Sequence, residues 1–195
     1  IFYQYDAEKW IVIPLMMVLL KSHLPLAGGG SQCRWVVRSR TRYTCRMAAV
    51  TVVITSCNQG PLIREAVESA LSQTVRPERI IIVDDGSDDQ ASVNVLSAIL
   101  DDCRHGVPDT GGVAVDLIGQ VNAGPSAARN RGVAAAETPF VVVLDGDDRL
   151  MPTFIERTLP LLTADDSMVA ASGWLRTFGV LDSVVQPIGG DAGAF

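Results

Sequence analysis

Three carboxylates within four positions, Asp145, Asp147 and Asp148, form the pattern in this sequence that could most readily do chemistry. Gly146 lies between them and, because it lacks a Cβ, lets the backbone turn sharply and a ligand approach closely. Neighbouring carboxylates repel one another unless a cation or protons neutralise them, and hard divalent cations prefer oxygen ligands. The cluster predicts a Mg²⁺ or Mn²⁺ site that holds a phosphorylated ligand. A solvated acidic turn that caps the next helix is the alternative.

A buried strand is predicted directly before this cluster. Residues 140–144 read Phe-Val-Val-Val-Leu and show no alternation of apolar and polar residues. Such a run is typical of a strand that is buried on both faces of a parallel sheet. Ligands of open α/β sheets bind outside the carboxyl ends of the strands. We therefore expect the acidic cluster at the ligand-binding edge of a sheet.

Strands and helices alternate along the chain from residue 50 onward. Apolar residues at helical spacing predict a helix after Pro61, another after the second strand, a small-residue helix from Pro125 and a fourth from Pro152. Alternation of this kind predicts an α/β fold with a mostly parallel sheet and helices on both faces. Runs rich in Val, Ile and Thr predict the strands, over residues 50–56, 79–83, 113–118, 140–144 and 168–174.

Some local features of the helices are also predicted. Leu62 and Val93 belong to the apolar faces of the first and second helices. Ser87 or Asp88 is expected to cap the second helix, because both side chains can accept a backbone hydrogen bond. Pro160 is expected to kink the fourth helix or end it early, because proline lacks the backbone N–H.

A second acidic turn, Asp84-Asp85-Gly86-Ser87, follows the strand predicted over residues 79–83. If the two strands that end in acidic turns are neighbours in the sheet, their carboxylates share one crevice. The helix that starts at Pro125 carries Arg129, and its small residues allow it to sit close to the sheet. Taken alone, Arg129 could be an ordinary surface arginine of this helix.

Charge is unevenly distributed over the 195 residues, whose formal net charge is -6. Residues 1–47 contain seven Lys or Arg against two acidic residues, and the remainder contains nine against twenty. Binding to a nucleic-acid backbone requires basic residues that neutralise phosphates. A domain this acidic is therefore not expected to bind nucleic acid.

The first quarter of the chain has a different character. Residues 10–20 are mostly apolar but fall short of the ~20 residues that span a bilayer. They are similar to the apolar part of a secretory signal, with residues 25–27 as a poor cleavage site, in which case a secreted form would begin near Gly28. The chain does not begin with Met, and the Arg-rich run over residues 34–46 shows no clear period.

We therefore expect two regions. Residues 1–47 are interpreted as an N-terminal extension, disordered or upstream of the true start near Met47. Residues 48–195 are interpreted as the functional domain, cut short at its C-terminus, with a Gly-rich tail over residues 181–195 that contains no evident element.

The four cysteines, at positions 33, 45, 57 and 103, show no metal-ligand spacing. Reduced thiols in a cytoplasmic protein are the default interpretation. Membrane association is expected only for a longer, full-length form.

Taken in order and spacing, four stretches of this sequence resemble the family 2 glycosyltransferases, inverting enzymes with a nucleotide-sugar-binding fold of the GT-A type. The resemblance covers residues 50 to about 175. The stretches are residues 52–58 (Val-Val-Ile-Thr-Ser-Cys-Asn), 70–74 (Ala-Leu-Ser-Gln-Thr), 82–87 (Ile-Val-Asp-Asp-Gly-Ser) and 122–148, which holds Asn-Ala-Gly, Ala-Arg-Asn-Arg-Gly and Leu-Asp-Gly-Asp-Asp.

The resemblance implies roles for particular residues. Thr55, Cys57 and Asp85 would hold the nucleoside, since a carboxylate can accept a hydrogen bond from a uracil-type N–H. Arg129 would add positive charge near the donor. In the family's Asp-x-Asp motif, Asp145 would face the ribose or sugar.

The same motif implies a metal cofactor and a donor. Asp147, together with Asp148, would hold Mn²⁺ or Mg²⁺ against the diphosphate of a UDP- or GDP-sugar. The acceptor hydroxyl could belong to a saccharide, a lipid or a protein. Inverting transfer needs a general base, which the family usually places beyond the point where this chain ends. Asp182 and Asp191 are available but lie in no recognisable motif.

Two alternatives remain open, and the sequence argues strongly against a third. A nucleotide-diphosphate-binding fragment without turnover would keep the donor site but lack the base. A nucleotidyltransferase would need a Gly-rich loop with a basic residue after the first strand, whereas residues 56–60 read Ser-Cys-Asn-Gln-Gly. A phosphoacceptor receiver domain would need a late lysine, and no lysine follows Lys21.

Overall fold

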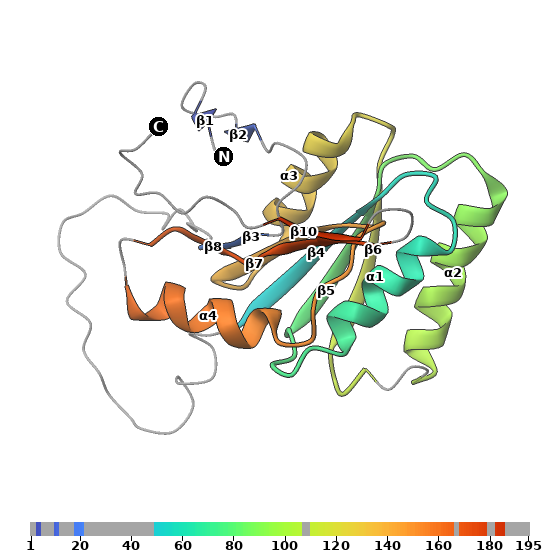
Figure 1. The fold of residues 1–195 in the computed structure, drawn as a ribbon. Coiled ribbons are helices and arrows are strands. Elements are labelled where there is room, and N and C mark those ends of the chain that lie inside the picture. Colours follow the sequence, from blue (N-terminus) through green and yellow to red (C-terminus); the bar gives the residue numbers. More distant parts are fainter. Residues whose placement is uncertain are drawn as a thin grey trace, which may run out of the picture.

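A six-stranded sheet with the strand order β6-β5-β4-β7-β3-β8 organises the molecule (Figure 1). The computed structural model describes residues 3–4, 10–11, 18–21, 49–106, 110–165, 168–178 and 182–185. Strands β4, β5, β6 and β7 pair in parallel, as the sequence predicts. The six strands are β3 (Val18–Lys21), β4 (Val50–Ser56), β5 (Arg79–Asp84), β6 (Ala114–Gly119), β7 (Phe140–Asp145) and β8 (Ala170–Ser172).

Helices cover both faces of this sheet, and each face has its own apolar core. Helices α1 (Leu62–Leu71), α2 (Gln90–Arg104) and α4 (Phe154–Ala164) contribute to the larger core. Helix α3 (Pro125–Ala135) packs on the opposite face, where its Ala128 joins the smaller core. The predicted α/β architecture is therefore confirmed.

The two middle strands are the most deeply buried. Every residue of β4 is buried, and so is every residue of β7 except Asp145. Side chains of one strand alternate between the two cores: Val52 and Ile54 of β4 face the larger one, while Val53 faces the smaller one. Burial on both faces explains why these strands lack polar alternation. It also fixes where they end, because Asp145 leaves the core at the carboxyl edge of the sheet.

Strand β3 was not predicted. Its backbone runs antiparallel between β7 and β8, with Val18 opposite both Val143 and Ser172. It belongs to the region interpreted as an N-terminal extension, and that interpretation stays a prediction. Residues 25–27, Gly28 and the Arg-rich run lie outside the described residues, as do Cys33 and Cys45.

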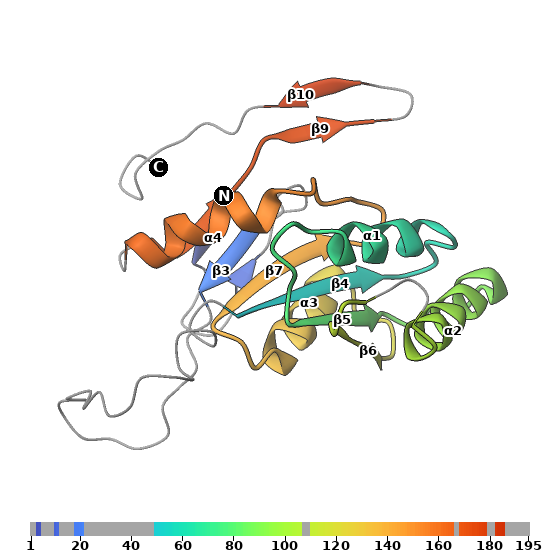
Figure 2. The ribbon, with the colours of Figure 1, turned by 90° about the horizontal axis from the view of Figure 1, so that it is seen from below.

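Two small hairpins complete the described structure. Strands β1 (Tyr3–Gln4) and β2 (Trp10–Ile11) form one, and β9 (Leu175–Thr177) and β10 (Ser183–Val185) form the other. The β9–β10 hairpin lies on the side of the sheet that carries α1 and α4 (Figure 2). The expectation that the tail after residue 181 contains no element was wrong, since β10 lies there.

Two local predictions about the helices were also wrong, and a third was wrong in part. Asp89 caps α2 by accepting the Ser92 N–H at 2.8 Å, because Ser87 and Asp88 are engaged by other residues. Helix α4 continues past Pro160 to Ala164, since its buried leucines hold it against the sheet, so the predicted early end was wrong, whereas the kink stays a prediction. The side chains of Leu62 and Val93 are exposed at the rims of their helices.

In the part of the chain that the structure describes, no helix combines the length and the apolar character needed to cross a membrane.

Candidate functional site

A cavity of about 350 Å³ opens at the carboxyl edge of the parallel strands. All six residues that the sequence predicts for nucleotide-sugar binding line it, although β5 and β7, which end in the acidic turns, are separated by β4. The condition that these two strands be neighbours is not met, yet their carboxylates share one cavity. The six are Thr55, Cys57, Asp85, Arg129, Asp145 and Asp147, and Ser56, Gln59, Asn122, Gly124, Pro125 and Ala128 complete the lining.

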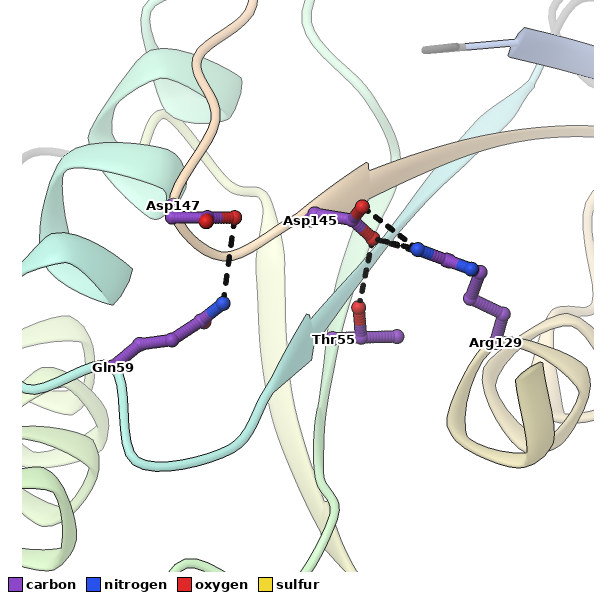
Figure 3. A network of polar contacts seen from close by, with 5 residues as sticks. All are labelled: Thr55, Gln59, Arg129, Asp145 and Asp147. Carbon is purple, nitrogen blue, oxygen red and sulfur yellow. Dashed lines mark hydrogen bonds and ion pairs between the residues drawn. The ribbon is translucent and has the colours of Figure 1, made fainter. Parts of the chain in front are cut away.

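Asp145 is fixed by a buried arginine (Figure 3). The Arg129 guanidinium donates Nη2–H to both carboxylate oxygens of Asp145 at 2.7 Å and Nε–H to Oδ1 at 3.1 Å. The Thr55 hydroxyl donates to the same Oδ1 at 3.2 Å. Arg129 is buried, so the alternative that it is an ordinary surface arginine was wrong. Three of the predicted site residues thus form one rigid network.

Close packing of helix α3 explains how Arg129 reaches this position. A Cβ added at Gly132 would lie 2.2 Å from Cγ1 of Val53 and 3.1 Å from Cγ2 of Val83, distances too short for a side chain. Only glycine lets the helix backbone lie this close to β4 and β5. The small residues noted in the sequence therefore bring the backbone of Arg129 close enough for its side chain to reach the end of β7.

Asp85 is buried and holds the loop that leads into α3. Its Oδ1 accepts hydrogen bonds from the Gln120 amide at 2.7 Å and the Ala123 N–H at 2.8 Å, and its Oδ2 accepts the Gly124 N–H at 2.8 Å. Burial raises the pKa of Asp85, but these hydrogen bonds outweigh burial and leave the pKa below its ordinary value. Asp85 is therefore ionised at neutral pH, with one acceptor position remaining on Oδ2.

Asn58 joins the loops that follow β4 and β5. It adopts a left-handed backbone conformation with φ 53°. Its side-chain oxygen accepts the Asp88 N–H at 3.0 Å, and its amide donates to the Asp88 carboxylate at 2.7 Å. The Asn58 N–H donates to the Ser87 hydroxyl at 2.9 Å. The sequence analysis missed this role, although Asn is the residue that tolerates left-handed conformations best after glycine.

Gly146 is required by its neighbours in the acidic turn. A Cβ there would lie 2.1 Å from Oε1 of Gln59 and 2.7 Å from the carbonyl oxygen of Thr55. The Gly146 N–H donates to that carbonyl at 2.8 Å. The turn is thus pressed against the end of β4, which orients Asp147 toward the cavity.

The two carboxylates predicted to hold a metal differ in their surroundings. Asp147 lines the cavity and, among the described residues, accepts only one long hydrogen bond, 3.4 Å, from the Gln59 amide. Asp148 does not line the cavity. Burial raises the pKa of Asp148. The negative charges of Asp147 and Asp145 raise this pKa further, and the positive charge of Arg129 lowers it. The turn therefore carries like charges that its surroundings compensate only in part.

These residues fit a hard divalent cation in their donor chemistry. Within the described ranges, no three His, Cys, Asp or Glu side chains are grouped as a metal site. Mg²⁺ in phosphate-handling sites, however, usually takes only one or two carboxylates together with substrate phosphates and water. Asp147 on the cavity wall and Asp148, its neighbour in sequence, have the donor chemistry of such a pair.

Two further side chains at the cavity are informative. The buried Ser56 hydroxyl has no hydrogen-bond partner in the described structure. The partly exposed Cys57 thiol is a free cysteine. Burial and then Asp85 raise its pKa, so Cys57 is a neutral thiol rather than a nucleophile.

The two candidates for a general base gain no support. Asp182 forms a bidentate ion pair with Arg176 on the exposed β9–β10 hairpin, with Nε to Oδ1 at 3.0 Å and Nη2 to Oδ2 at 2.9 Å. The hydrogen bond and charge of Arg176 lower the pKa of Asp182, which weakens it as a base. Asp191 lies outside the described residues.

Comparison with known proteins agrees with this geometry. The sequence profile of Glycosyl transferase family 2 matches residues 51–188. The match spans more than half of the chain, and the chain therefore belongs to this family. Membership, together with the parallel sheet and its two helical layers, confirms the expected α/β fold of the GT-A type.

Curated relatives match about three fifths of the chain. An uncharacterized glycosyltransferase, YibD of Escherichia coli (strain K12), is 36% identical over 121 residues, which are 62% of this chain and 32% of that protein. The succinoglycan biosynthesis protein ExoO of Rhizobium meliloti (strain 1021) is 34% identical over 121 residues, with the same coverage. The chain thus spans about a third of the length of these relatives.

Similar solved structures include S. aureus TarS, with 23% identity and a TM-score of 0.44 over 55% of this chain and 18% of that one. The mannosyltransferase PcManGT from Pyrobaculum calidifontis, in complex with GDP-Man and Mn²⁺, is 26% identical with a TM-score of 0.42 over 51% of this chain and 28% of that one.

Proposed function

We propose that this chain binds the donor of an inverting glycosyl transfer, a nucleoside-diphosphate sugar, in the cavity at the carboxyl edge of its sheet. The main support for this proposal is that six side chains, from the ends of β4, β5 and β7 and from α3, line the same cavity. Its volume of about 350 Å³ lies within the range of small-molecule sites. Family membership supports a glycosyltransferase over the nucleotidyltransferase and receiver alternatives.

The nucleoside end of the donor is proposed to contact Asp85. The carboxylate is ionised and its Oδ2 can accept one more hydrogen bond, which suits the N–H of a uracil-type base. Thr55 and Cys57 complete this end of the cavity.

The sugar and diphosphate are proposed to lie toward the acidic turn. Arg129 and Thr55 hold the Asp145 carboxylate in place, and Asp145 Oδ2 keeps an acceptor position for a ribose or sugar hydroxyl. Asp147 and Asp148 would hold Mg²⁺ or Mn²⁺. When bound, such a cation supplies positive charge that offsets the charge on the departing nucleoside diphosphate.

In the proposed transfer, the acceptor hydroxyl attacks the anomeric carbon from the side opposite the diphosphate. The bond from that carbon to the phosphate oxygen breaks, its electron pair leaves with the nucleoside diphosphate, and a general base takes the hydroxyl proton. Inversion follows from this single displacement. A cation-assisted donor site in this chain would position the sugar for that attack.

Donor binding without turnover is the second candidate. The observation that favours it is the ion pair between Asp182 and Arg176, which occupies one of the two carboxylates considered as the base. Transfer or hydrolysis of a UDP- or GDP-sugar by the purified chain would rule this candidate out.

The test of the donor site is calorimetric titration with UDP and with GDP, each in the presence of Mn²⁺ and of a chelator. We expect one nucleotide to bind, with affinity that falls when Mn²⁺ is removed. Asp147→Asn should abolish the Mn²⁺ dependence, whereas Glu68→Gln, which removes an exposed carboxylate from α1, should not. Failure of a folded chain to bind either nucleotide would refute the proposal, and unchanged Mn²⁺ dependence in Asp147→Asn would refute the metal assignment.

A further inference from the structure

An aromatic surface made of Trp174 and Phe178 lies outside the donor cavity. The two residues flank β9, and they are 66% and 53% exposed. Neither lines the cavity. Large aromatic side chains carry a substantial apolar area and are usually covered, so two on one short segment indicate a surface that binds something.

The strand register places Trp174 at the ligand-binding edge. Strand β8 is antiparallel to β3, which is antiparallel to β7, so β8 and β7 run in the same direction. Ser172 and Val143 both lie opposite Val18. Strand β8 therefore ends at the same edge of the sheet as β7, and Trp174 follows two residues after its last paired residue. The ends of β8 and β7 are two strand spacings apart, roughly 10 Å, which is about the length of two sugar rings.

A direct contact ties Phe178 to the acidic turn. The Arg149 guanidinium, next in sequence to Asp148, lies over the Phe178 ring at 4.7 Å from its centroid. Arg149 also forms an ion pair with Glu65 of α1. This arginine therefore joins the turn, the hairpin and α1, and it keeps the aromatic surface beside the turn rather than free in solution.

The chemistry of this surface selects among possible occupants. Arg176 lies between the two aromatic residues and is paired with Asp182, so polar groups interrupt the apolar area. An extended lipid surface would need a larger continuous apolar patch. Arg176 and Arg149 are paired with the carboxylates of Asp182 and Glu65, so neither offers an unpaired positive charge to an anionic molecule. A neutral saccharide matches these features, because its ring offers a C–H face to an indole and its hydroxyls can bond to polar neighbours.

Resting on the proposed donor site, we propose that Trp174 and Phe178 bind the acceptor, and that the acceptor is a neutral saccharide. Its ring packs on the Trp174 indole, and its hydroxyl reaches the edge of the sheet near Asp145. Phe178, held by Arg149, supports the next part of the saccharide.

The test uses an array of immobilised neutral oligosaccharides of glucose, galactose, mannose and N-acetylglucosamine, probed with the whole chain. We expect binding to at least one of them, weakened roughly tenfold or more by Trp174→Ala and by Phe178→Ala. Val169→Ala is the matched control. Val169 is also exposed, at 61%, but it precedes β8 and so lies at the amino end of that strand, away from the ligand-binding edge. Thermal unfolding confirms that each variant folds.

Two results would overturn this proposal: no binding of the wild type to any oligosaccharide on the array, or equal losses in Trp174→Ala and Val169→Ala. Trp174-dependent binding to phosphatidylcholine vesicles, without saccharide binding, would assign the surface to lipid instead. The UDP and GDP titrations separate the two proposals. If a nucleotide binds normally to Trp174→Ala and the array result is negative, only the acceptor inference fails, whereas absence of nucleotide binding removes the donor site itself.

Discussion

Replacing Arg129 by Met should destabilise the fold and disturb the donor site together. The substitution keeps an unbranched side chain of similar length but removes the guanidinium, which makes three hydrogen bonds of 2.7 to 3.1 Å to Asp145. The Arg129 side chain is 6% exposed and that of Asp145 is 27% exposed. Asp145 would remain behind as a partly buried carboxylate without its counter-charge.

The size of the effect follows from this partial burial. Removing one member of a fully buried ion pair costs about 3–5 kcal/mol, and a hydrogen bond to a charged group contributes about 1.5–3 kcal/mol. Because water reaches more than a quarter of Asp145, it can replace part of what is lost. We therefore expect the free energy of unfolding to fall by about 2–3 kcal/mol.

Urea denaturation measures this change, and a double-mutant cycle with Asp145→Asn isolates the pair. The two single variants and the double variant should show a coupling energy above about 1 kcal/mol. Arg131→Met is the control, because Arg131 is exposed on the same helix. A loss for Arg129→Met no larger than that of Arg131→Met, or additive losses in the cycle, would show that the ion pair does not hold the site together.

Three further predictions follow from other contacts. Gly132→Ala should lower the free energy of unfolding by about 1–3 kcal/mol through overpacking, and Val53→Ala should restore part of it in the double variant, as urea melts would show. The pKa of Asp85 is lower in the folded state, so the stability that Asp85 contributes is present above its unfolded pKa, about 3.9, and is lost as the pH falls through the folded pKa. The difference in the free energy of unfolding between wild type and Asp85→Asn should therefore shrink over that acidic range. A difference that does not change with pH would contradict this. Deletion of residues 1–47 removes β3 and leaves β7 and β8 without a shared partner; we expect lower thermal stability and association in light scattering, whereas a dispensable extension would leave both unchanged.

Much of the core fold could be predicted because its signals are local. The runs at β4, β5 and β7 are β-branched, and Pro125 opens α3 at its favoured first position. The six predicted cavity residues came from the resemblance to the family, whose motifs follow one another along this chain in the expected order. Each lies within a few residues of a strand end or a helix start, where side-chain type is informative about position.

The remaining features depend on contacts between distant segments. Strand β3 pairs with strands more than a hundred residues away, and its apolar run has no local property that separates it from a signal-like stretch. The burial of Arg129 depends on how closely Gly132 approaches Val53, which sequence spacing does not encode. Ser87 and Asp88 likewise form hydrogen bonds with Asp84 and Asn58, and Asp89 caps α2 instead.

The outer strand β6 carries a consequence for how copies of this chain meet. Asp116 lies on that strand and pairs with Arg79 of β5, Nε to Oδ2 at 2.6 Å, with both side chains partly open to water. A strand from another molecule that docked against β6 would have to lie beside this ion pair and remove part of its hydration. At the opposite end of the sheet, β8 is only three residues long and therefore offers a short template. The ion pair on β6 and the short length of β8 both disfavour the pairing of sheets between molecules. We therefore expect the molecules to stay separate at high concentration and not to extend their sheets into fibres.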